Sequence, residues 1–164
     1  MRHQLNITGQ LRTAISYLIS ESMDNIVDHA NVQNGWIMVQ NYPSKHFLDI
    51  CILDTGVGIR GSYVNNNFSE IINDEMAIRQ AINGQSTKQI AETRGYGINT
   101  SRRMLVDGIN GKYFLYSGAA FYVYTSELEQ ITPLNRLYRW NGTMLALRIP
   151  RDIPAKFDYS AYLE

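Results

Sequence analysis

The chain has 164 residues, of which 45% are hydrophobic and 18% are charged, a composition that is typical of one globular domain and argues against long disorder. Fifteen Lys and Arg residues balance fifteen Asp and Glu residues, so no net charge attracts nucleic acid or an anionic membrane. No stretch reaches the ~20 apolar residues of a membrane span, no signal peptide is recognisable, and the single cysteine, Cys51, cannot form an internal disulfide. We therefore expect one cytoplasmic domain over residues 1–164.

The hydrophobic spacing changes between helical and strand-like along the chain, and Gly, Pro and Asn mark the breaks. In chain order it predicts a helix at 8–30, strands at 36–42 and 46–53, a glycine-rich loop at 54–58, a short helix at 74–83, a polar segment at 84–96, a helix at 97–106, strands at 111–116 and 119–125, and a final strand at 143–149. This order favours an α/β (α+β) two-layer sandwich, in which helices cover one face of a mixed, mostly antiparallel sheet. The polar segment is expected to be a functional lid or a disordered insertion.

Glu21, Asn25 and Asp28 are spaced four and three residues apart on the first predicted helix, so their side chains lie within an arc of roughly 60°. Asn25 projects partly onto the apolar stripe, where a buried polar group needs hydrogen-bond partners. Taken alone, the triplet is more simply explained as a solvated helix flank, because acidic helix faces are common.

The segment Asp54–Ile59 places two glycines and an aspartate at the end of a predicted strand. Gly56 and Gly58 permit close approach of a ligand to the backbone, and the Asp54 carboxylate can accept a hydrogen bond from an amine. A glycine-rich turn with a turn-forming aspartate explains the segment equally well.

Gly95-Tyr96-Gly97 comes directly before a helical pattern, where backbone N–H groups and the helix dipole favour phosphates. The same polar segment adds two hydroxyls and a cation from Ser86, Thr87 and Lys88. The alternative for this segment is a flexible surface loop with a glycine hinge.

In this order the motifs resemble the N, G1, G2 and G3 boxes of the ATPase family that unites gyrase, Hsp90, histidine kinases and MutL (the GHKL family). The matching residues are Glu21-x-x-x-Asn25, Asp54-x-Gly56-x-Gly58-Ile59, Gly95-Tyr96-Gly97-Ile98 and Gly142-Thr143. Residues 84–88 resemble the lid of histidine kinases, and residues 21–30 look like the N box of anti-sigma-factor serine kinases. The resemblance implies a Bergerat-type ATP-binding fold with a core at about 11–150, an ATP lid at about 84–96 and a C-terminal extension at 151–164.

The resemblance also implies ATP and Mg²⁺ as cofactors and a role for each matched residue. Glu21 would orient or deprotonate the attacking group, and Asn25 would bind the nucleotide through the metal ion. Asp54 would bind the adenine amine with help from Thr143, and Asp28 would support the nucleotide. The remaining nucleotide-binding residues that it implies are Gly56, Gly58, Ile59, Ser86, Thr87, Lys88, Gly95, Tyr96, Gly97 and Ile98.

The departures from the family narrow the predicted function. No histidine-kinase phosphoacceptor motif surrounds His3, His29 or His46, and 164 residues leave no room for the second domain of gyrase-like and MutL-like members. We interpret the chain as a signal-transduction kinase that transfers the terminal phosphate of ATP to a protein partner. It would be either an anti-sigma-type serine/threonine kinase or a detached histidine-kinase catalytic domain.

Its partner would be an anti-anti-sigma-like domain, a response regulator or a second copy, and neither nucleic acid nor a membrane is expected to bind. The alternative is an ATP-dependent binding module with little turnover. Tyrosines at 113, 116, 122 and 124 alternate as expected for cross-strand packing. The segment 126–141, with its Trp140, is either a surface loop or a partner-docking edge.

Overall fold

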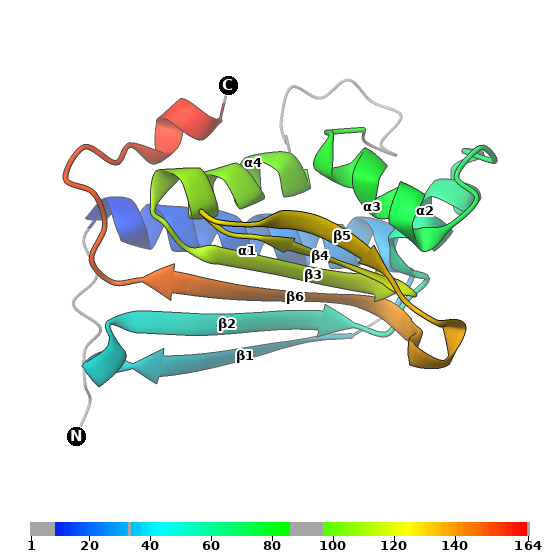
Figure 1. Cartoon of the computed structure of the whole chain (residues 1–164), viewed down its shortest axis with the longest axis horizontal. Coiled ribbons are helices and arrows are strands. Elements are labelled where there is room, and N and C mark those ends of the chain that lie inside the picture. Colours follow the sequence, from blue (N-terminus) through cyan, green and yellow to red (C-terminus); the bar gives the residue numbers. More distant parts are fainter. Residues whose placement is uncertain (1–8, 33, 86–96, 164) are drawn as a thin grey trace.

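The structure is a computed structural model, and it describes residues 9–32, 34–85 and 97–163. Within these ranges, four helices pack against a six-stranded open antiparallel sheet, which makes an α+β fold (Figure 1). The helices are α1 (Gly9–His29), α2 (Gly58–Asn65), α3 (Asp74–Ile82) and α4 (Gly97–Arg103). The strands are β1 (Gly35–Tyr42), β2 (Phe47–Asp54), β3 (Lys112–Gly118), β4 (Ala120–Tyr124), β5 (Glu129–Pro133) and β6 (Trp140–Pro150).

The sheet has the strand order β1-β2-β6-β3-β4-β5, and every neighbouring pair is antiparallel. The prediction of a mixed sheet is therefore wrong for the described strands. β2 and β3 are joined through helices and run in the same direction, as a helical crossover favours. However, β6 returns from the end of the chain and inserts between them, antiparallel to both, so the parallel pair does not form.

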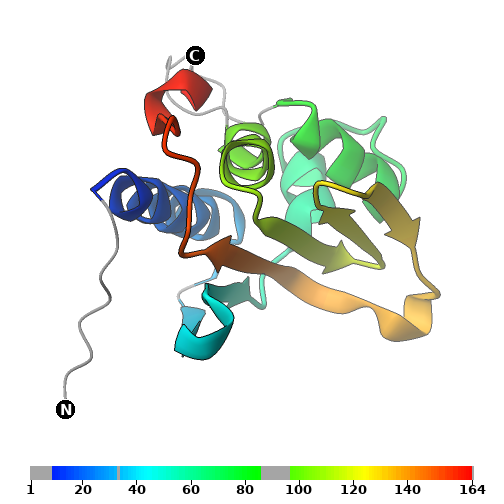
Figure 2. The same cartoon turned by 60° about the vertical axis from the view of Figure 1, so that its left-hand side comes forward.

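The helices lie on one face of the sheet, and the main hydrophobic core fills the space between the two layers (Figures 1 and 2). β2 shows why, because its side chains alternate between buried and half-buried positions. The buried ones face the helices and the half-buried ones face away. The largest completely buried side chains of this main core are Leu11, Leu18, Ile50, Ile78, Met104, Leu105, Ile109, Tyr113, Leu115 and Tyr122, while Tyr63 and Ile71 belong to a second, smaller cluster.

The tyrosine-rich hairpin confirms the prediction of cross-strand packing. Tyr113 and Tyr122 are 1% and 0% exposed, and their rings meet edge to face with centroids 6.2 Å apart, a favourable geometry for aromatic pairs. Tyr116 is half-buried on the other face of the sheet. These side chains therefore build the core and the sheet surface.

Two elements are absent from the prediction. α2 lies mostly in residues 59–64, to which the sequence pattern assigns no element; it contains two glycines, and tertiary packing of Ser62 and Tyr63 holds it in place. β5 lies inside the unassigned segment 126–141 and pairs with β4. The helix predicted at 97–106 is α4 followed by a π-helical turn at Met104–Gly108. Among the described helices, none is both long and apolar enough to cross a membrane.

Candidate functional site

The glycine-rich loop after β2 is tied directly to the end of α1. The backbone N–H of Val57 donates to the carbonyl of Ala30 at 3.0 Å. A Cβ on Gly56 would lie 2.0 Å from that same carbonyl oxygen, so the loop can approach the helix only with glycine at this position. This contact brings the second predicted motif against the helix that carries the first.

This close approach predicts a large effect of adding one methyl group. Gly56→Ala is expected to lower the free energy of unfolding by about 1–3 kcal/mol, because the colliding atom belongs to the backbone and cannot rotate away. Gly9→Ala is the matched control, since a Cβ there meets nothing within 4 Å. Urea unfolding of both variants tests the contact, and equal stabilities would show that the loop is not packed on α1 as described.

Asp54 is the last residue of β2, and its side chain is only 4% exposed. Its Oδ1 accepts hydrogen bonds from the backbone N–H of Gly56 at 2.8 Å and of Thr143 at 3.3 Å. Burial raises the pKa of this carboxyl above its ordinary value of 3.8, while the two N–H groups act in the opposite direction. One buried carboxylate thus joins two predicted motifs that lie 89 residues apart.

The start of β6 approaches Asp54 through its backbone as well. Gly142 has a φ of +125°, and a Cβ there would lie 2.1 Å from the Asp54 carbonyl oxygen, so both its conformation and its surroundings require glycine. The indole N–H of Trp140 donates to that carbonyl at 3.2 Å. Trp140 is therefore part of the site, whereas Leu137 and Tyr138 before it are 87% and 67% exposed.

Ser117 on β3, which belongs to none of the predicted motifs, links the glycine-rich loop to β6. Its hydroxyl accepts from the N–H of Ile59 at 2.9 Å and donates to the carbonyl of Gly142 at 3.0 Å. Thr143 Oγ1 lies 3.3 Å from the serine oxygen. No sequence pattern points to Ser117, because Ser117-Gly118 looks like an ordinary hairpin turn. Only the pairing of β3 with β6 brings this serine to the site.

The predicted catalytic residue lies beside the beginning of α4. A Cβ on Gly97 would be 4.0 Å from Glu21 Oε2, so the first and third predicted motifs also meet. Tyr17, one turn earlier on α1, shares a side-chain hydrogen bond with Thr100 of α4. Burial, and then the charge of Glu21, raise the pKa of Tyr17 to about 12.

The other predicted residues fall into three groups. Asn25 is half-buried and Asp28 is exposed on α1. Ile59 and Ile98 are partly buried against the main core, which is a structural role that they hold whether or not a ligand binds. Ser86, Thr87, Lys88, Gly95 and Tyr96 lie outside the described residues.

No group of three or more His, Cys, Asp or Glu side chains in the described ranges could hold a metal ion by itself. The metal ligand predicted from the sequence, Asn25, supplies a single amide oxygen. Mg²⁺ usually takes one or two protein oxygens and completes its shell with phosphates and waters, so this residue fits a nucleotide-bound ion rather than a preformed protein cage.

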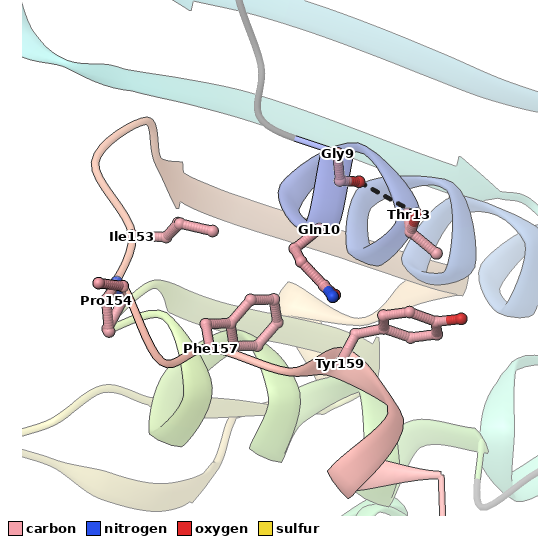
Figure 3. Close-up of a pocket in the computed structure, with 8 residues that line it drawn as sticks. Gly9, Gln10, Thr13, Ile153, Pro154, Phe157 and Tyr159 are labelled. Atoms are coloured by element: carbon pink, nitrogen blue, oxygen red, sulfur yellow. Dashed lines mark hydrogen bonds between the residues drawn. The ribbon is translucent and has the colours of Figure 1, made fainter.

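A groove of about 550 Å³ lies elsewhere, between the beginning of α1 and the segment after β6 (Figure 3). Its lining residues are Gly9, Gln10, Thr13, Ile153, Pro154, Ala155, Phe157 and Tyr159. None of them belongs to the predicted motifs. Because the glycine-rich loop is attached to the other end of the 21-residue helix α1, roughly 30 Å away along the helix, the groove is separate from the site around Asp54.

Comparison with known proteins adds no further assignment. A scan against models of protein families finds no match to this chain, and a search of curated proteins finds none either.

Proposed function

We propose that the chain binds Mg-ATP in a Bergerat-type pocket beside Asp54 and transfers the terminal phosphate to a protein partner. The observation that carries this proposal is the buried Asp54 carboxylate, fixed by backbone N–H groups of two glycine motifs. Both hydrogen bonds end on Oδ1. The second oxygen, Oδ2, is the acceptor that we propose for the exocyclic amine of adenine.

The glycines around Asp54 support the proposal because they fix the position of its carboxylate. Gly58 has a φ of +70°, and Gly142 holds its own strand in contact with the Asp54 backbone. A Cβ at Gly58 would lie 2.9 Å from Ser117 Oγ, so glycines at both positions let the loop, β3 and β6 pack together and fix Asp54 where we propose that adenine binds. GTP should bind poorly, because its carbonyl would face the Asp54 carboxylate where adenine presents an amine.

In the proposed reaction, Glu21 holds the acceptor hydroxyl and takes its proton. The phosphoryl group leaves the bridging oxygen, which stays on ADP, and bonds to the acceptor oxygen. Mg²⁺ would neutralise the phosphate charge when it is bound with the nucleotide, and Asn25 would supply one of its oxygen ligands. Glu21 supports an enzyme over a passive binder, since nucleotide binding alone needs no carboxylate at this position.

We further propose that the acceptor is a serine or threonine hydroxyl of a cytoplasmic regulatory protein. The resemblance of residues 21–30 to the N box of anti-sigma-factor kinases supports this choice. A phosphohistidine product, which is labile in acid, would instead favour the detached histidine-kinase hypothesis.

The test combines binding and transfer. Calorimetry with Mg-ATP and Mg-GTP should give a Kd for ATP that is at least about tenfold lower, which corresponds to ~1.4 kcal/mol. ATP labelled on its terminal phosphate, incubated with the chain and a lysate of its source cells, should then label a protein only when the chain is added. ATP binding without either labelled protein or ADP formation would support the alternative, an ATP-dependent binding module. Equal affinity for both nucleotides would reject the proposed adenine pocket.

A further inference from the structure

β1 is an edge strand whose outer side pairs with no strand in the described part of the chain. Its first six residues, Gly35 to Gln40, are all exposed. Trp36, Ile37, Met38 and Val39 are 49%, 45%, 64% and 54% exposed. Single apolar residues on a surface are ordinary, but four in a row on an unpaired edge form a site where another strand can add.

The opposite edge of the sheet is protected in the usual way. β5 has only five residues, carries Glu129 in an ion pair with Arg102 at 2.8 Å, and ends at Pro133. β1 has eight residues and contains no charged residue and no proline. Short length, charge and proline are the features that prevent edge-to-edge pairing, and β1 has none of them.

The register of β1 places its apolar side chains on both faces of the sheet. Ile37 and Val39 lie opposite Ile52 and Ile50, whose side chains are buried beneath the helices. The alternate residues of β1, including Trp36 and Met38, lie opposite half-buried residues of β2 and therefore point to the open face. A partner that packed on one face of the sheet would leave the β1 side chains of the other face exposed. A strand added beside β1 would contact the β1 side chains on both faces and would pair with the free backbone N–H and C=O groups of β1.

We propose that β1 pairs antiparallel with β1 of a second copy of this chain across a two-fold axis at Met38. Along β1, the backbone N–H and C=O groups of every second residue point outward, and these groups must meet each other in the two copies. Even-numbered residues of one copy therefore lie opposite even-numbered residues of the other, and odd opposite odd. A two-fold axis therefore passes through a residue and not between two. An axis at Met38 sets Ile37 against Val39 of the second copy, twice by symmetry, and joins the two sheets into one.

The charge distribution favours a second copy as the occupant. Since residues 35–42 are uncharged, the two-fold axis brings no like charges into opposition. The formal net charge of the chain is zero at pH 7, so two copies experience no long-range repulsion. A foreign strand would need its own matching sequence, while a second copy supplies the complementary residues automatically.

α1 adds apolar surface to the same side of the molecule. It is the outermost helix of its layer where the sheet ends at the β1–β2 hairpin (Figure 2). Met23 and Val27 are 38% and 76% exposed. Each is two residues from Asn25 and thus ~200° around the helix from it, so these exposed apolar side chains do not lie on the flank that carries the candidate site.

Light scattering tests the association. The wild-type chain should have twice the mass of one 18.8 kDa chain, and Met38→Lys should have the mass of one, because two lysines would meet at the axis. Leu137→Lys, at a residue 87% exposed outside β1, is the control and should remain a dimer. Circular dichroism and a cooperative urea-unfolding transition verify that Met38→Lys is folded. A single-chain mass for the wild type at ~100 μM would overturn the proposal, as would a dimer of Met38→Lys.

Cross-linking tests the register even if Met38→Lys fails to fold. Cys51 lies opposite Met38 within the same chain, so the test uses a Cys51→Ala background. Oxidised Met38→Cys should then form a disulfide-linked dimer, because residues opposed in antiparallel strands are close enough to bridge. Gln40→Cys should not, since the two copies of residue 40 would be ~13 Å apart. Efficient cross-linking through residue 40 and not residue 38 would reject the proposed axis.

Discussion

Replacing Glu21 by glutamine is expected to lower the rate of phosphate transfer by about 10²–10⁴-fold while ATP affinity stays within a few-fold of wild type. Glutamine keeps the size of the side chain and its place beside Gly97, but it cannot take the proton of the acceptor hydroxyl. Rates of ADP formation and of transfer to the labelled protein, measured at saturating Mg-ATP, separate this effect from binding.

Asp24→Asn is the matched control for Glu21→Gln. It also removes one carboxylate charge from α1, and Asp24 is exposed and is not among the residues to which the resemblance assigns a role. Its rate should equal that of the wild type. Wild-type transfer by Glu21→Gln would remove the base from the mechanism, and Glu21 would then be only a carboxylate on a helix flank.

Asn25→Ala should differ from Glu21→Gln because its effect on ATP affinity should depend on magnesium. Loss of an amide oxygen removes one ligand from the ion that neutralises the phosphates. ATP affinity should therefore fall in the presence of Mg²⁺ and change little in EDTA. An equal loss under both conditions would assign Asn25 to direct contact with the nucleotide or to packing of α1.

The elements predicted best are those with long, regular patterns. The hydrophobic spacing predicts the first helix at 8–30, and the structure has it at Gly9–His29; the two strands that follow agree within one residue at each end. Local periodicity determines such segments almost alone. α2 was missed because glycines at 58 and 61 weaken its helical pattern, and its stability comes from tertiary packing that no local window contains.

The order of the strands required information from distant parts of the chain. The position of β6 between β2 and β3 converts a sheet expected to be mixed into an antiparallel one. The same insertion brings Thr143 to Asp54 and Ser117 to Ile59. The residues at 54–59 fit a turn and a ligand loop equally well, and only the resemblance to a family favours the ligand loop. The contacts that place Ser117 and Trp140 in the site depend on strand pairing, which no local sequence pattern contains.

Replacing Asp54 by asparagine is expected to weaken ATP binding by about 10- to 150-fold, the equivalent of a charge-assisted hydrogen bond of about 1.5–3 kcal/mol. The amide can still accept from the N–H groups of Gly56 and Thr143 through one oxygen. Asp49→Asn, in the same strand, is the control. Asp49 pairs with Arg148 at 2.8 Å at the sheet surface, so its loss should leave ATP affinity unchanged.

The same variant should be at least as stable as the wild type at neutral pH, which distinguishes a ligand-binding carboxylate from a structural one. Because burial raises the pKa of Asp54 in the folded protein, the folded state holds this proton more tightly than the unfolded state. Ionisation therefore costs stability as pH rises above the ordinary value of 3.8, and the cost is complete above the raised pKa. The free energy of unfolding of Asp54→Asn should therefore exceed that of the wild type increasingly as pH rises above 3.8, and the difference should vanish at lower pH. Urea unfolding at a series of pH values measures this difference. A large loss of stability at pH 7, with ATP affinity intact, would make Asp54 a structural turn residue and would remove the main support for the adenine pocket.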